Sequence, residues 1–197
     1  MNNSQTGIQK VYVRKKDEFD FLSKSTKAEI ENSLNLSLKD LKVYRRYDIE
    51  CSEELLEKIL YTILAEKPVD CLLFGDQVKT LEESFQSPLR VSYLPGQFDQ
   101  REQGLLDTIA LFSDKAIRAK VSLVYDIKGA GEEALEAIKK FLINPVDSHE
   151  IALDENLLAE KEMDNNLENR IFDGFINFNK KELEEFLEKE NLAMSLD

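Results

Sequence analysis

Several residue types that catalytic sites commonly use are scarce in this 197-residue chain, which has no tryptophan, one histidine and two cysteines. Cys51 and Cys71 lie in apolar surroundings without a CxxC spacing, which favours reduced core thiols over a disulfide or a redox motif. His149 has no second histidine or cysteine nearby, which argues against zinc ligation and histidine-assisted nucleophilic catalysis. We therefore expect His149 to be a linker residue, and no metal site.

Long apolar runs are also absent. The longest span only a few residues, such as positions 71–74, whereas a membrane-spanning helix needs about 20. The first seven residues, MNNSQTG, are polar and contain no apolar signal segment, so we expect no export. Together these absences predict a cytoplasmic protein without a membrane partner.

Acidic charge is in excess and unevenly distributed. The formal net charge is −13; residues 149–197 contain 5 Lys/Arg and 14 Asp/Glu, a net of −9, which leaves −4 for residues 1–148. An acidic chain repels a phosphate backbone, so no nucleic-acid partner is expected. The exception is a basic group near the start, which forms either a weak binding patch or a solvated strand edge. Its members are Lys10, Arg14, Lys15, Lys16, Lys42, Arg45 and Arg46.

An internal match dominates what the sequence does contain. LKVYRRYDI at 41–49 and AKVSLVYDI at 119–127 share Lys, Val, Tyr, Asp and Ile at positions 78 apart. Further matches follow in the same order, which indicates a duplicated module. They pair Val11 with Val91 at a spacing of 80, residues 53–59 with 132–138 at 79, and residues 68–70 with 145–147 at 77.

The periodicity predicts an α/β (α+β) fold made of two tandem β-α-β-α-β repeats, at about 8–75 and 89–148, in a domain covering 1–148. Two arginines inside the strand at 41–50 suggest a bend or an exposed edge. Residues 76–88 are expected to join the halves with one helical turn. The expected strands are 8–14, 41–50, 69–75, 89–94 and 119–127, and the expected helices are 26–34, 52–66, 101–112 and 131–144.

A three-stranded sheet with helices on one face is marginal by itself, so we expect the halves to pack about a pseudo-twofold, either face to face or edge to edge. Residues 149–197 are expected to form a mostly helical acidic segment. Asn179 starts a capping box there, before a helix that buries Leu183, Phe186 and Leu187. The apolar run that ends at Asp197 resembles a cut end.

Two motifs have a functional and a plain structural interpretation. Tyr47-Asp48 and Tyr125-Asp126 predict either a polar contact at a domain or subunit seam, or a strand-end Asp that begins a turn. The stretch LPGQFDQR at 94–101 predicts either a partner-recognition loop or an ordinary strand-to-helix turn. Its candidate contact residues are Gln97, Phe98, Asp99 and Arg101. GAGEEA at 129–134 is a turn rather than a phosphate loop, because its glutamates occupy the position of the anion.

Three segments together resemble a known family. YLPGQFDQR at 93–101, INPVDS at 143–148 and the early run KVYV…RRYDIE…LLEKILYTILAEKPVD are similar to the N-terminal region of the large, single-chain phosphoribosylformylglycinamidine synthases. The resemblance implies a fused pair of PurS-like modules over 1–148, followed at 149–197 by the beginning of a linker domain. It adds Asn144 and Asp147 to the contact candidates.

In that family the complete enzyme is an ATP- and glutamine-dependent ligase of de novo purine biosynthesis that uses Mg²⁺. Its synthetase region uses ATP, and its glutaminase region releases ammonia with a Cys nucleophile and a His base. Cys51 and Cys71 match no such nucleophile motif, so the resemblance implies that this chain holds no cofactor and catalyses nothing alone. Its implied role is to organise the synthetase and glutaminase regions for ammonia transfer, and the fragment could self-associate.

Two alternatives remain open. A stand-alone regulatory module would bind a small effector in a pocket between its two halves. An RNA-binding module would need a basic, aromatic sheet face, which the net charge of −13 disfavours.

Overall fold

The structure is a computed structural model that describes residues 7–111, 113, 117–159 and 178–189. It is a mixed α/β fold with a six-stranded antiparallel sheet and several helices. In chain order the elements are β1 (Gly7–Lys15), α1 (Phe21–Leu34), β2 (Asp40–Cys51), α2 (Glu53–Ile59), the π-helical turn η1 (Leu60–Leu64), β3 (Asp70–Phe74), α3 (Asp76–Ser84), β4 (Pro88–Tyr93), α4 (Gln100–Ile109), β5 (Arg118–Lys128), α5 (Glu132–Leu142), β6 (Ser148–Ile151) and α6 (Lys180–Lys189).

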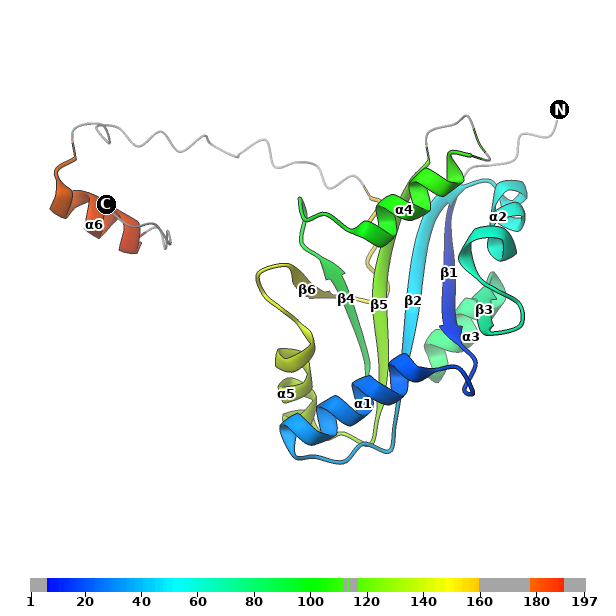
Figure 1. Cartoon of the computed structure of the whole chain (residues 1–197), viewed down its shortest axis with the longest axis horizontal. Helices are drawn as coiled ribbons and strands as arrows, with labels where there is room; N and C mark the ends of the chain where they lie inside the picture. Colours follow the sequence, from blue (N-terminus) through cyan, green and yellow to red (C-terminus); the bar gives the residue numbers. More distant parts are fainter. Residues whose placement is uncertain (1–6, 112, 114–116, 160–177, 190–197) are drawn as a thin grey trace. The chain divides into compact units, whose positions relative to one another are not determined.

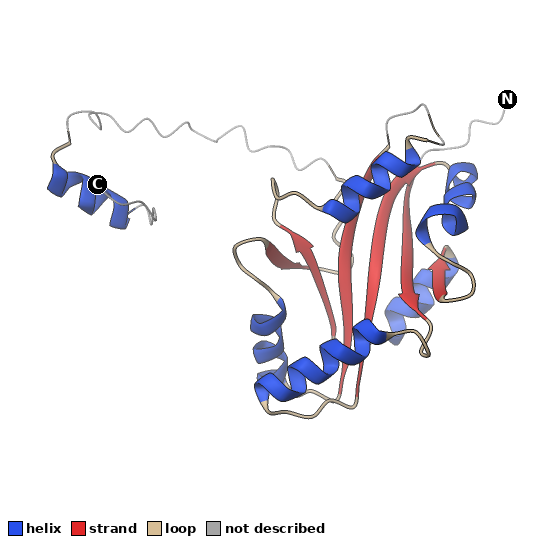
Figure 2. Cartoon of the chain, in the orientation of Figure 1, coloured by secondary structure: helices blue, strands red, loops and turns tan. Residues whose placement is uncertain are grey.

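The six strands form one sheet in the order β3-β1-β2-β5-β4-β6, with every neighbouring pair antiparallel (Figures 1 and 2). The long strands β2 and β5 lie at its centre and pair from Asp40 opposite Lys128 to Glu50 opposite Arg118. The two sequence halves therefore meet edge to edge through backbone hydrogen bonds. This is one of the two arrangements expected from the sequence.

The strand pairings of the first half recur 78 residues later in the second half. Segments 41–49 and 119–127 are separated by the same 78 residues. Val11 lies opposite Tyr47 in β1 and β2, and Leu89 lies opposite Tyr125 in β4 and β5, so both members of the pair move by this spacing. The register aligns Val11 with Leu89, so the expected match of Val11 to Val91 is wrong by two residues. A two-residue shift keeps a side chain on the same face of a strand, so the hydrophobic pattern alone did not exclude it.

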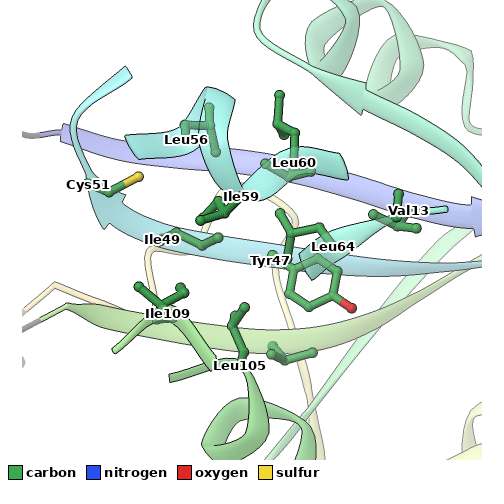
Figure 3. Close-up of a cluster of buried hydrophobic side chains, with 14 residues drawn as sticks. Val13, Tyr47, Ile49, Cys51, Leu56, Ile59, Leu60, Leu64, Leu105 and Ile109 are labelled. Carbon is green, nitrogen blue, oxygen red and sulfur yellow. The ribbon is translucent and has the colours of Figure 1, made fainter. Parts of the chain in front are cut away.

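Four helices cover one face of the sheet, and both main hydrophobic clusters on that face combine helices from the two sequence halves. In the cluster of Figure 3, Ile59 of α2 and Ile109 of α4 pack over Ile49 of β2. In the other, Ile30 of α1 and Ile138 of α5 share their neighbours on β2 and β5. Neither half therefore closes its own core, which explains why the sheet has to be continuous.

The opposite face is covered by α3, which lies behind the sheet in Figure 1. Val78 of α3 is buried beside Tyr12 and Tyr44, and Phe85 packs its ring against both tyrosines. The sequence predicted a single turn here, whereas the structure has a nine-residue helix. Helix α3 is stabilised by packing against apolar side chains on this face of the sheet. The sequence of residues 76–88 alone did not predict that contact.

Most element ends agree with the sequence. Ser52 caps α2, accepting a 3.3 Å hydrogen bond from the Leu55 N–H, and the capping box before α6 is confirmed by bonds of 2.8 and 3.1 Å between Asn179 and Glu182. The expected bend or edge at Arg45 and Arg46 is wrong. Strand β2 is central and Arg46 is buried, because ionic partners on the far face satisfy its charge.

The sheet extends past residue 148, where the sequence placed the start of a linker domain. Strand β6 pairs with β4, and the compact unit reaches Ala159 because Ile151 and Leu158 are buried. His149 therefore lies in an edge strand and not in a linker. Helix α6 belongs to a separate unit and half-buries Leu183 and Phe186. The expected burial of Leu187 lies outside the described side chains.

The described helices include none with the length and apolar character that crossing a bilayer requires.

Gly129 provides a test of the turn between β5 and α5. Its φ is +83°, and a Cβ there would lie 2.8 Å from Lys39 Cβ and 2.9 Å from Lys39 N. Gly129→Ala should lower the free energy of unfolding by about 1–3 kcal/mol, measured by urea titration. Gly104→Ala is the matched control, because Gly104 lies inside α4 with open space around it; this change should raise stability by about 0.5–1 kcal/mol. Equal effects would contradict the turn geometry.

The two thiols should differ in reactivity. Burial raises the pKa of Cys51 to about 11, so at pH 8 roughly one molecule in a thousand carries the thiolate. Cys71 is only half-buried. Iodoacetamide at pH 8 should label Cys71 first, and both cysteines only in denaturant, as read by peptide mass spectrometry. Equal native labelling rates would contradict the burial of Cys51.

Candidate functional site

Residues 94–99 connect β4 to α4 in an ordered turn. The Leu94 N–H donates to the Asp147 carbonyl at 2.8 Å, and the Gln97 N–H donates to the Leu94 carbonyl at 3.0 Å. Asp99 caps α4 by accepting from the N–H groups of Arg101 and Glu102 at 2.8 and 3.3 Å. The segment is thus a regular strand-to-helix turn that nevertheless leaves Phe98 71% exposed.

The second loop that carries predicted candidates lies beside the first. The Asn144 amide donates to Asp147 Oδ2 at 3.0 Å, and the Gln97 amide reaches the Val146 carbonyl at 3.4 Å. Gln97, Asn144 and Asp147 are therefore brought together, although Gln97 lies far from the other two along the chain. No residue type in either segment alone predicted this contact.

A cavity of about 170 Å³ lies where β4 leaves β5, between the start of α4 and the end of α5. The pairing of β4 with β5 ends at Val91 opposite Leu123, although β4 itself continues to Tyr93. Four of the predicted candidates line the cavity: Asp99, Arg101, Tyr125 and Asp147. The other lining residues are Val91, Ser92, Tyr93, Val121, Ser122, Leu123, Leu142 and Ser148.

Arg101 acts on two buried phenols near this cavity. Burial raises the pKa values of Tyr47 and Tyr125; Arg45 opposes the shift of Tyr47 most strongly, and the positive charge of Arg101 opposes both shifts. Both phenols remain protonated at neutral pH and can donate hydrogen bonds. Within the described ranges, no ion pair engages the Arg101 guanidinium.

Exposed apolar side chains flank the cavity. Tyr93, Phe98 and Val146 are 40%, 71% and 75% exposed, and we call these three the corner surface. The hydrogen bonds from residues 94 and 97 to residues 147 and 146 hold its two loops together. Clustered apolar exposure of this kind is typical of a contact surface.

The Tyr-Asp motifs place their carboxylates on the opposite face of the sheet. Asp48 accepts from Arg46 Nη2 at 2.8 Å and from Arg90 Nη2 at 2.6 Å, and all three residues are at most 1% exposed. Because Arg90 belongs to β4, this is a polar contact between the two sequence halves. We call Arg46, Asp48 and Arg90 the ionic cluster.

The ionic cluster also attaches the chain that follows β6. Arg90 Nη1 donates to the carbonyls of Glu155 at 2.8 Å and Ala152 at 3.2 Å, and Arg46 Nη1 donates to the Leu153 carbonyl. Burial and the neighbouring Arg46 lower the pKa of Arg90, with Asp48 opposing the shift. Arg46 Nη1 also donates to Tyr12 Oη and Glu82 Oε1, each at 3.4 Å, and Arg90 Nε donates to Ser122 Oγ at 3.0 Å.

Asp126 has a different role from Asp48. Its Oδ1 accepts from the Gln86 N–H at 2.8 Å, and its Oδ2 lies 3.4 Å from Lys128 Nζ, so it anchors the segment that enters β4. Neither Asp begins a turn, since β2 continues to Cys51 and β5 to Lys128. The alternative interpretation of the two motifs is therefore wrong for both.

The basic residues near the start do not form one patch. Hydrogen bonds from Lys42 and Arg14 hold the pKa of Asp17 at about 2. Lys15 pairs with Asp70 at 2.9 Å, while Arg46 is buried in the ionic cluster. Four of the seven basic residues are therefore paired with carboxylates.

Within the described part of the chain, no group of three His, Cys, Asp or Glu side chains could hold a metal ion. His149 Nδ1 is buried without a hydrogen-bond partner. Gly129 forms a tight turn and Gly131 precedes α5, as the plain interpretation of GAGEEA predicted.

Sequence reasoning missed the ionic cluster as a unit. Its one signal was alternation: Arg46 and Arg90, like Tyr12 beside them, face away from α1, α2, α4 and α5 at positions within their strands. The partners come from strands that are far apart along the chain, and only the sheet order brings them together.

Comparison of the chain with protein-family models, with curated proteins and with solved structures found no match.

Asp48 provides the test of this site. Asp48→Asn leaves two buried guanidinium groups without their shared carboxylate, so the free energy of unfolding should fall by about 3–5 kcal/mol in a urea titration. Asp17→Asn is the matched control, since Asp17 carries two ion pairs but its side chain is 71% exposed. It should change stability far less. Similar small effects for both variants would show that the ionic cluster contributes little.

Proposed function

We propose that this chain is the non-catalytic N-terminal scaffold of a phosphoribosylformylglycinamidine synthase, the ATP- and glutamine-dependent ligase of de novo purine biosynthesis. In this role it holds the synthetase and glutaminase regions of the enzyme so that ammonia passes between them. The compact unit that ends at Ala159 corresponds to two fused PurS-like β-α-β-α-β modules related by a pseudo-twofold, with β6 as the last strand of the second module. The linker domain begins after this unit and not at residue 149, and the protein works in the cytoplasm.

The observation that carries this proposal is the constant register. Strand β1 pairs with β2 and β3, and β4 pairs with β5 and β6 in the same register, 78 residues later. For example, Tyr12 lies opposite Leu73, and Arg90 lies opposite Ile151. The strand order reads the same from both edges when the corresponding strands are exchanged. A fused pair of modules explains both regularities.

The arrangement of the resembling motifs supports a docking role. Residues 93–101 and 143–148 come from different places in the chain, yet hydrogen bonds join them around the corner surface. Phe98 and Val146 are exposed there although they are apolar. A scaffold needs a rigid, exposed surface of this kind for the other regions of its enzyme.

The regulatory alternative predicted an effector pocket between the halves. At that seam the structure has a ladder of eleven residue pairs between β2 and β5. The cavity described above lies beside the seam, and all of its lining residues come from positions 91–148. The scaffold therefore remains the function that the geometry supports best.

A trans-complementation assay tests the proposal. Where the reading frame continues past Asp197, the downstream polypeptide made without residues 1–197 should lack most amidine-forming activity and regain it when this chain is added. Phe98→Asp should lower the restored activity about tenfold or more, because it puts a charge into an apolar contact.

Leu111→Asp is the matched control, because Leu111 is 82% exposed and is not part of the corner surface. It should restore activity as the unchanged chain does. If the downstream polypeptide is fully active alone, the scaffold proposal fails. If complementation works equally well with Phe98→Asp, the docking role of the corner surface fails.

A further inference from the structure

The cavity beside β5 has a counterpart in the first half of the chain. Strand β1 leaves β2 after Val13 opposite Arg45, just as β4 leaves β5 after Val91 opposite Leu123, at the corresponding position of the second half. Each departure opens a wedge between two strands. We call the gap beside β2 the first wedge and the gap beside β5, which contains the cavity, the second wedge.

In the first wedge the chain supplies polar groups of its own. Ser23 Oγ accepts from the Val43 N–H at 2.9 Å and donates to Asp20 Oδ2 at 2.7 Å. Arg14 Nη1 donates to the Lys15 carbonyl at 2.8 Å and lies 3.8 Å from Asp20 Oδ2. The protein thus supplies one hydrogen-bond acceptor and one cation to its own first wedge.

The second wedge lacks both groups. Asp20 caps α1 beside the first wedge, and Asp99 caps α4 beside the second wedge. The third residue after the cap is Ser23 in α1 and Glu102 in α4. The Glu102 carboxylate is engaged by Lys120 Nζ at 2.9 Å. In the strand register, the position of Arg14 corresponds to Ser92, which carries no charge.

Charged groups of both signs remain around the unfilled space. Arg101 lines it, and among the described residues no carboxylate pairs with its guanidinium. Asp147 also lines it, and its side chain is bonded by the neutral amide of Asn144. Asp99 accepts only backbone N–H groups. The wedge therefore offers one cation and two carboxylates without charged partners.

We propose that the second wedge binds a small zwitterion of the α-amino acid class. Its carboxylate takes the place of the Ser23 acceptor and pairs with Arg101, and its ammonium takes the place of the Arg14 cation and pairs with Asp99 or Asp147. A cavity of about 150 Å³ is enough for benzene, so 170 Å³ suits an amino acid with a short side chain. This proposal does not depend on the scaffold role.

Titration of the full 197-residue chain with L-serine and L-alanine tests the inference, followed by ¹H–¹⁵N NMR and by thermal unfolding. We expect saturable shift changes at residues 91–93, 101, 121–125 and 147–148, and a rise in Tm. Acetate and ethylamine, each carrying one of the two charges, should produce much smaller changes, because each leaves one charged partner in the wedge unpaired.

Two variants locate the site. Arg101→Gln should weaken amino acid binding about tenfold or more, the size expected for a lost charge-assisted hydrogen bond. Glu102→Ser places a hydroxyl where the first wedge has Ser23, and should reduce binding by filling the acceptor position. Lys79→Gln is the control, since its side chain is 84% exposed on α3; it removes the same charge and should leave affinity unchanged.

Three results would overturn the proposal. The first is the absence of any shift at millimolar amino acid concentrations while the NMR spectrum shows a folded chain. The second is an equal response to acetate or ethylamine alone, which would indicate simple ion binding. The third is unchanged affinity in Arg101→Gln, which would place the ligand elsewhere.

Discussion

The backbone ladder between β2 and β5 is the interaction on which the other contacts depend. It joins two three-stranded halves into one sheet, and it fixes which helices become neighbours. Each apolar cluster on the helical face takes one helix from each half, α2 with α4 and α1 with α5. Shifting the ladder by one residue would turn every inward side chain of one half outward, so the register and the core specify each other.

The two faces of the sheet are stabilised in different ways. The face under α1, α2, α4 and α5 is apolar, whereas the face under α3 also contains the ionic cluster, in which Asp48 pairs with two buried arginines. Buried charges are costly unless paired and hydrogen-bonded, and here carbonyls of residues 152–155 complete the pairing. The chain that leaves β6 is consequently part of the folded unit, because the arginines need its oxygen atoms.

The two halves are alike in backbone and different in side chains. Tyr12 and Arg90 occupy corresponding positions, as do Arg14 and Ser92. In the first half Ser23 bonds the backbone of β2 at its wedge, whereas the second half has a cavity beside exposed apolar loops. The cavity beside β5 therefore belongs to the second half, since its lining residues lie between positions 91 and 148.

The order of helices and strands could be predicted from the sequence because alternation, helix caps and proline breaks are local. The caps at Ser52 and Asn179 are examples, since each depends on residues three positions away. The segments around Gln97 and Asn144 also stood out as candidates. Their contact could not be foreseen, because their separation along the chain says nothing about which strand ends become neighbours.

The sequence by itself determined five of the six strands, most of the helices and the approximate spacing between the two halves, because hydrophobic period and turn chemistry are written locally. Only the tertiary structure decided that Arg46 is buried in the sheet, that α3 is a full helix, that β6 belongs to the sheet and that a cavity remains beside β5. Each of these depends on partners far away in the chain, and the free energy of burial is settled by those partners and not by the residue alone.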